Sequence, residues 1–141
     1  MKSLNLYISE KLVINKDYKD IYTYAPTSWE ELRKIIENRY NKLGPGTKQK
    51  PIDFNDIDVS NIDSFYNKDN DKGIFHTTKF EYIDISKWNV SNVEDISVMF
   101  SRCEQLKSVG DLSNWHVSKV EYMFNMFKES GIINIPKWYK R

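Results

Sequence analysis

The chain has few of the residues that usually carry catalytic or metal chemistry. It contains one cysteine, Cys103, two histidines, His76 and His116, and five scattered glycines in 141 residues. One cysteine cannot form an internal disulfide, and this usage is typical of a reducing compartment. The sequence has no glycine-rich phosphate-binding motif, and neither histidine has neighbours that would complete a catalytic group. We therefore expect no enzymatic activity, no metal and no cofactor.

An excess of one charge and long apolar runs are also missing. The 21 basic side chains nearly cancel the 20 acidic ones, so the net charge of +1 gives no overall attraction to nucleic acid or membrane. Polar residues from Asn5 to Lys11 interrupt the N-terminal segment, so neither a signal peptide nor a membrane-spanning helix is expected. These features favour a cytoplasmic protein with no membrane contact and no small-molecule substrate.

What the chain does have is an internal repeat. Residues 84–103 and 111–130 match at a constant offset of 27, which pairs Trp88 with Trp115 and Phe100 with Phe127. A degenerate copy begins at 54, and a third pass starts near 135. A repeat of this length predicts units that bury their apolar faces against one another.

Each repeat is expected to combine an extended segment with a short helix. Residues 85–90 suit the extended part. The tryptophans at the position of Trp88 in successive copies are expected to align as a ladder. Val93, Ile96, Phe100 and Cys103 share one face at helical spacing, with Met99 beside them. Residues 51–141 are therefore predicted to form the repeat region.

Residues 1–50 are predicted to form an N-terminal cap that packs with the repeats as one compact unit. Its expected elements are a helix at 3–12, a strand at 20–24 and a helix at 28–43. Ser28 and Glu31 form a capping box at the start of the last helix, and Gly44 suits its end. One side of this helix carries the apolar stripe Trp29, Leu32, Ile36, Tyr40 and Leu43.

The repeat text, "DISKWNVSNVEDISVMF" and "DLSNWHVSKVEYMFNMF", resembles the BspA-like leucine-rich-repeat surface proteins. The leader "YISEKLVINKD" is similar to that of small stand-alone members, some of them phage-encoded. The resemblance implies an α/β fold: a short right-handed leucine-rich-repeat-like solenoid, with a strand and a short helix in each repeat. It also implies binding of other macromolecules rather than catalysis. The chain departs from the surface members because it has neither a secretion signal nor a long array.

Three features that resemble chemistry have simpler interpretations. His116 occupies a repeat position expected at a turn facing solvent, and Cys103 lies on the expected buried face, where a small core thiol fits. Residues 67–73 look like half of a calcium loop. However, Lys72 and Thr78 stand where an EF-hand requires glycine and glutamate, so a polar surface loop is the better interpretation.

Positions at which the two copies differ are the candidate partner-binding residues. Tyr122 replaces Asp95, Phe124 replaces Ser97, and Val98 replaces Asn125. Val98, Tyr122 and Phe124 lie off the expected buried face, and exposed apolar groups close together can mark a contact surface. Packing against a neighbouring loop is the equally weighted alternative.

The leading functional hypothesis is a non-catalytic protein–protein interaction module with an unidentified protein partner. One alternative is a phage-encoded inhibitor of a host defence system, of the anti-CRISPR type, that binds a nuclease effector or its guide RNA. Another is RNA binding through the basic N-terminal half, where residues 1–50 carry ten basic and six acidic side chains. That alternative would use Arg33, Lys34, Arg39 and Lys42, although a solvated helix face explains these residues more simply.

Overall fold

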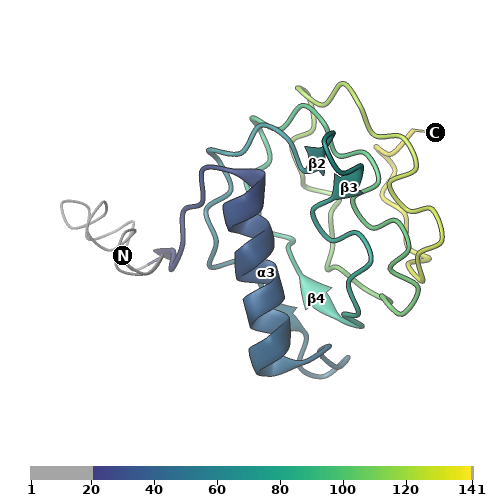
Figure 1. Ribbon diagram of the computed structural model, residues 1–141. Coiled ribbons are helices and arrows are strands. Elements are labelled where there is room, and N and C mark those ends of the chain that lie inside the picture. The colour runs from purple at the N-terminus through teal and green to yellow at the C-terminus, as the bar shows by residue number, and fades with distance from the viewer. Residues whose placement is uncertain (1–20, 141) are drawn as a thin grey trace.

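The computed structural model describes residues 21–140, which form a small α/β domain made mostly of turns and loops. Figure 1 shows the helix α3 (Trp29–Leu43) along one side of the domain, with the C-terminal segments on the opposite side. The strands are short: β1 (Ile52–Asp53), β2 (Tyr66–Asn67), β3 (Lys72–Gly73) and β4 (Ile83–Asp84). β1 pairs in parallel with β4, and β2 pairs in antiparallel with β3.

The N-terminal elements are only partly within this range. The helix expected at 3–12 lies outside the described residues, as does the first residue of the strand expected at 20–24. In the remainder of that segment, Tyr24 makes a single parallel bridge to Ile57.

The helix predicted over 28–43 is confirmed, together with both of its ends. Ser28 has extended backbone and its Oγ accepts a hydrogen bond from the N–H of Glu31 at 3.1 Å. At the other end Gly44 has φ 78°, and its N–H donates to the carbonyl of Tyr40 at 2.7 Å. These two residues satisfy backbone groups that a helix leaves free at its termini, as the sequence pattern predicts.

The buried face of α3 differs from the predicted stripe at one end. Leu32, Ile35 and Ile36 are buried, and Trp29 and Tyr40 are partly buried. Leu43 was predicted to lie in this stripe, but it is 57% exposed because it lines an open hollow at the C-terminal end of the helix.

The predicted leucine-rich-repeat-like solenoid is wrong. Between residues 44 and 140 the chain contains β1 to β4 but no helix, so a strand with a short helix in each repeat is not formed. The rest of this region is turns and loops. Helix α3 packs along residues 53–76, where its side chains donate to backbone carbonyls.

Backbone conformation explains why the expected short helices do not form. Val98 and Arg102 have φ of 50° and 59°, and their counterparts in the next copy, Asn125 and Glu129, have 53° and 59°. A right-handed helix requires negative φ at every residue, so these positions interrupt it. Successive turns direct the same apolar residues inward, and this arrangement mimics the spacing of a helix face.

Backbone hydrogen bonds run between neighbouring segments rather than along a helix. The N–H of Ile96 donates to the carbonyl of Tyr122 at 2.8 Å, and that of Val98 donates to Phe124 at 3.0 Å. The matching segments therefore satisfy each other's polar groups, as a buried backbone requires.

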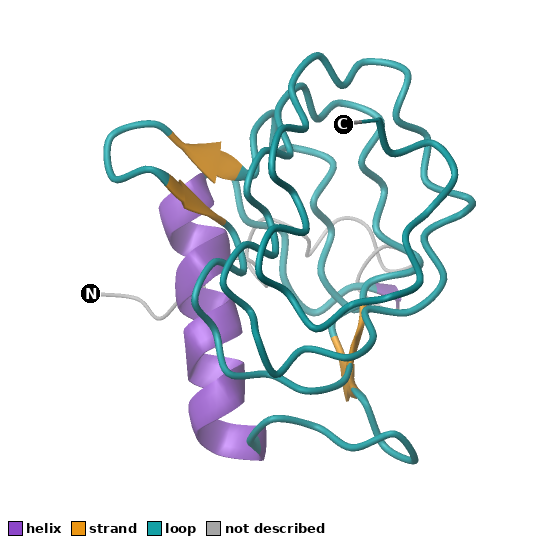
Figure 2. Ribbon diagram, turned by 90° about the vertical axis from the view of Figure 1, so that its right-hand side faces the viewer, coloured by secondary structure: helices purple, strands orange, loops and turns teal. Residues whose placement is uncertain are grey.

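Aromatic rings fill the interior. Phe75 stacks on Phe100 at 5.7 Å between ring centroids and on Trp88 at 5.8 Å. Full burial of such a side chain contributes about 1.5–3 kcal/mol. Figure 2 shows the looping segments side by side next to α3, with the β2–β3 hairpin projecting from them. The fully buried phenylalanines are Phe54, Phe65, Phe75, Phe80 and Phe100.

Candidate functional site

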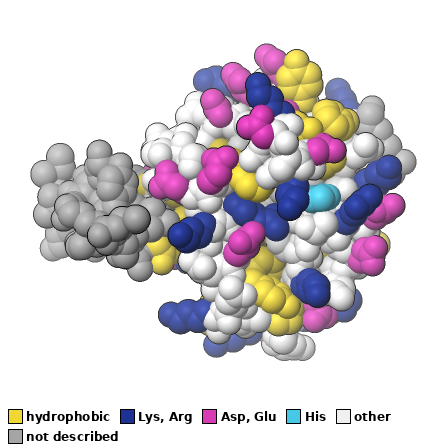
Figure 3. Space-filling view, viewed as in Figure 1, with side chains coloured by type: hydrophobic (Ala, Val, Ile, Leu, Met, Phe, Trp, Pro, Cys, Tyr) yellow, Lys and Arg dark blue, Asp and Glu magenta, His cyan; other side chains and the backbone are white. Residues whose placement is uncertain are grey.

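A groove of about 610 Å³ lies between the start of α3, the β2–β3 hairpin and the segment around 122–124. We call it the aromatic groove, because Trp29, Tyr66, Tyr122 and Phe124 all line it. It brings together Tyr122 and Phe124, two of the three residues predicted from differences between the repeat copies. Figure 3 shows hydrophobic side chains at the upper end of the domain, with acidic and basic side chains around them.

The aromatic side chains of the groove are available for contact. Tyr122 is 55% exposed and Phe124 is 51% exposed, whereas most large apolar side chains of the domain are buried. The rings of Tyr66 and Phe124 meet edge to face with centroids 6.1 Å apart. Tyr66 donates from its hydroxyl to Oδ1 of Asp71 at 2.7 Å, and this bond raises the pKa of the tyrosine. The hydrogen bond fixes the position of the Tyr66 ring beside Phe124.

The backbone places Tyr122 in a row with residues from two other segments. Ser64 forms a parallel bridge with Asp95, and Asp95 forms one with Tyr122. The side chain of Asp95 is also held in place, because its Oδ1 accepts a hydrogen bond from the N–H of Ser97 at 2.8 Å. The floor of the groove is therefore built on paired backbone.

Carboxylates border the aromatic surface. The groove is lined by four acidic residues, Glu30, Asp63, Asp69 and Asp95, and by one basic residue, Lys68. None of the ion pairs found among residues 21–140 involves these four carboxylates. The groove therefore combines exposed rings with an excess of negative charge.

Sequence reasoning missed Trp29, Tyr66 and the acidic border. The repeat offset contained a usable signal. Offsets of 31 and 27 place Tyr66, Ser97 and Phe124 at equivalent positions in three successive copies. Aligning the degenerate copy through residues 64–66 would have placed Tyr66 near Phe124.

Val98, the third predicted contact residue, does not line the groove. It is half-buried, and its carbonyl lies against Gly73, where an added Cβ would be 2.3 Å from the oxygen.

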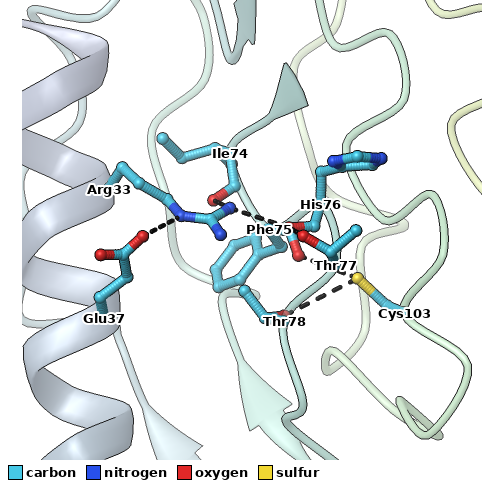
Figure 4. Close-up of polar contacts among 8 residues, drawn as sticks. All are labelled: Arg33, Glu37, Ile74, Phe75, His76, Thr77, Thr78 and Cys103. Atoms are coloured by element: carbon cyan, nitrogen blue, oxygen red, sulfur yellow. Dashed lines mark hydrogen bonds and ion pairs between the residues drawn. The ribbon is translucent and has the colours of Figure 1, made fainter. Parts of the chain in front are cut away.

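Two of the four basic residues considered for RNA binding make bonds inside the domain. Arg33 donates to the carbonyls of Ile74 and His76, both at 3.0 Å, and pairs with Glu37 at 2.8 Å. Figure 4 shows this guanidinium turned from α3 toward the neighbouring loop.

Arg39 is held in a similar way. It binds Asp56 through two nitrogens, at 2.6 and 3.1 Å, and donates to the carbonyl of Asp53 at 2.8 Å. Lys34 and Lys42 are exposed. Lys42 also lines a second hollow, of about 800 Å³, below the C-terminal end of α3.

The cysteine and the histidines lie outside the groove. Cys103 is buried and donates from Sγ to the carbonyl of Phe75 at 2.9 Å, and burial raises the pKa of its thiol (Figure 4). His76 is half-buried, and desolvation followed by the charges of Arg102 and Arg33 lowers its pKa. His116 is exposed. Within residues 21–140, no group of three or more potential ligands could hold a metal ion.

The family comparison covers two thirds of the chain. Residues 46–139 match the model of a family described as "Mycoplasma protein of unknown function, DUF285". α3 lies outside the matched region. No curated protein and no solved structure matches the chain. Among the helices described for residues 21–140, none is both long and apolar enough to cross a membrane.

Proposed function

We propose that this chain, which belongs to the DUF285 family, is a protein-binding module that holds a basic segment of its partner in the aromatic groove. The observation that carries this proposal is the position of Tyr122 and Phe124. Both are more than half exposed, and they line one groove with Tyr66 and four carboxylates.

The chemistry of the groove favours lysine and arginine side chains. A cation over the face of an aromatic ring gains about 0.5–2 kcal/mol, depending on how far it is desolvated. The long stems of lysine and arginine also cover apolar surface while their charged ends stay polar. A partner side chain that crosses Phe124 would therefore reach the carboxylates at the border.

The same groove disfavours RNA, because phosphates would meet carboxylates. Arg33 and Arg39 use their guanidinium groups inside the domain, and this leaves Lys34 and Lys42 as exposed cations of the predicted set. Protein binding is therefore the function that we favour.

We also propose that the chain is a small member of the BspA-like group, to which the DUF285 family is related. The support is the repeat text itself, in which tryptophan, serine, valine and the Met-Phe pair recur in register. This placement agrees with a binding role.

A random twelve-residue peptide library displayed on phage tests the function. Peptides selected on the purified chain should be enriched in lysine and arginine. Their binding should weaken at least tenfold in Asp63→Asn/Asp69→Asn, which removes two charges from the groove. Glu104→Gln is the matched control, since Glu104 is exposed and does not line the groove. Selected peptides without basic enrichment, or equal loss in the control, would contradict the proposal.

A further inference from the structure

One row of backbone donors at the C-terminal end of the domain has no acceptor. Residues 122–129 form what we call the C-terminal edge. No hydrogen bond among residues 21–140 uses the N–H groups of Met123, Asn125, Phe127 or Glu129 as donors. Asn125 and Glu129 are exposed, and Met123 and Phe127 are half-buried.

The preceding segment, residues 96–102, shows how such a row of N–H groups is hydrogen-bonded when a neighbouring segment is present. There the N–H groups at the four equivalent positions all donate to carbonyls of the C-terminal edge. The distances are 2.8 Å from Ile96 to Tyr122, 3.0 Å from Val98 to Phe124, 2.9 Å from Phe100 to Met126 and 3.0 Å from Arg102 to Lys128. The N–H groups of the C-terminal edge are thus equivalent to a row of donors that, in the preceding segment, is hydrogen-bonded to a neighbouring segment.

We infer that the C-terminal edge binds a segment of a partner protein that follows the turns of the edge and supplies a row of carbonyl acceptors at every second residue. This inference rests on the proposed function and adds the mode of binding. As in strand addition, affinity would come from backbone hydrogen bonds and specificity from alternate side chains. All four isolated bridges of the domain are parallel, so we expect a parallel segment.

A second copy of this chain does not fit as the occupant. Two copies related by a two-fold axis would bring donor rows face to face. The carbonyls of Asn125 and Phe127 already accept hydrogen bonds within their own turns, from Lys128 at 3.2 Å and Ser130 at 3.1 Å.

Head-to-tail stacking of copies is blocked at the other end of the domain. A stacked copy would have to offer the carbonyls of residues 53–76. α3 uses several of these, since Arg39 donates to Asp53, Trp29 to Phe65, and Arg33 to Ile74 and His76. The occupant is therefore a foreign segment.

The C-terminal tail contacts two side chains of the C-terminal edge. Tyr139 packs edge to face on Phe127 at 5.0 Å, and the N–H of Lys140 lies 3.3 Å from Sδ of Met123. The tail therefore covers apolar side chains of the edge and makes no hydrogen bond to its free N–H groups.

The location of the edge agrees with the aromatic groove. Ser64, Asp95 and Tyr122 lie side by side on three consecutive segments. A fourth segment on the C-terminal edge would extend this row, with one of its side chains next to Tyr122 and another, two residues on, next to Phe124. A lysine or arginine at either place would lie against an exposed ring. We therefore expect lysine or arginine at the alternate positions of the partner segment that face Tyr122 and Phe124.

Amide exchange measured by NMR on the full chain tests this inference. The probe is a peptide selected from the displayed library. At saturation it should slow exchange at Asn125, Phe127 and Glu129 at least tenfold. Exchange at Ile133 and Asn134, which are exposed outside the edge, should not change.

A second measurement identifies the peptide carbonyls. An ester in place of one peptide bond weakens the carbonyl as an acceptor, so a scan of single esters should weaken binding with a period of two. A peptide that requires Tyr122 but leaves exchange at the edge unchanged would overturn the edge inference and keep the proposed function. If no peptide binds the chain, both are overturned.

Discussion

Trp88 donates a hydrogen bond from its indole Nε1 to the carbonyl of Phe54 at 2.8 Å, across 34 residues of sequence. The same bond recurs from Trp115 to Ile85 at 3.1 Å and from Trp138 to Leu112 at 2.8 Å. Trp115 and Trp138 also stack, with centroids 6.1 Å apart. The tryptophans of the repeat thus fill the interior and also bind the backbone of a neighbouring segment.

Trp88→Phe should destabilise the domain by about 1–3 kcal/mol, because it removes one of the two donors to the carbonyl of Phe54, the other being the N–H of Ile57, and leaves space in the buried interior. Urea unfolding followed by circular dichroism measures the effect without using tryptophan fluorescence. Trp138→Phe is the matched control and should cost less, since Trp138 is only partly buried and water can replace the bond. Equal stability of Trp88→Phe and the unmodified chain would refute the structural role of this bond.

A reciprocal exchange tests the turn that replaces the expected helix. Val98 and Asn125 occupy equivalent positions, with φ of 50° and 53°. Positive φ is strained for a β-branched side chain and tolerated by asparagine, with a difference of about 1–2 kcal/mol. Val98→Asn should therefore raise the midpoint of thermal unfolding, and Asn125→Val should lower it. Opposite signs would mean that packing of Val98 outweighs its backbone strain.

These positions also show what could and could not be predicted from the sequence. Helix α3 was predictable because Ser28, Glu31 and Gly44 are local signals that act on their own neighbours. Val93, Ile96 and Phe100 were correctly expected to be buried. Their spacing, however, fits either a helix face or a series of turns. The choice depends on hydrogen bonds to a segment 26 residues away, such as Ile96 to Tyr122.

The candidate site was predictable to a similar extent. Differences between the copies identified Tyr122 and Phe124, because stacking does not dictate the residue at those positions. Trp29 could not be assigned to the same surface from the sequence, and Tyr66 only through the offset of 31 between the first two copies. They reach it through the β2–β3 hairpin and the start of α3, whose positions depend on tertiary packing.

The half-buried His76 should make stability depend on pH. Burial, then the charges of Arg102 and Arg33, lowers its pKa below the ordinary value of about 6.5. The unfolded chain therefore binds a proton more readily, so this contribution is present at neutral pH and is lost as pH falls below about 6.5.

Urea unfolding at pH 7 and pH 5 should show a smaller loss of stability in His76→Gln than in the unmodified chain. His116→Asn replaces the exposed histidine and should retain the loss seen in the unmodified chain. An unchanged pH dependence in His76→Gln would exclude His76 as its source.

Nucleic-acid binding can be tested without disturbing the fold. Lys34→Glu/Lys42→Glu reverses the two exposed charges of the predicted basic set and leaves the internal bonds of Arg33 and Arg39 in place. We expect no salt-dependent binding of a twenty-nucleotide single-stranded RNA, either before or after this change. Binding that falls with added salt and is lost in the variant would instead support the RNA alternative.

The affinity of a selected basic peptide for three forms of the chain tests the central claim most directly. Isothermal titration calorimetry should give a dissociation constant at least tenfold weaker for Tyr122→Ala/Phe124→Ala than for the unmodified chain, because truncation removes the exposed rings of the groove. Ile133→Ala provides the control, since Ile133 is 85% exposed and does not line the groove. It should bind the peptide as the unmodified chain does. Unchanged affinity in the double variant, or an equal loss in Ile133→Ala, would contradict binding at the aromatic groove.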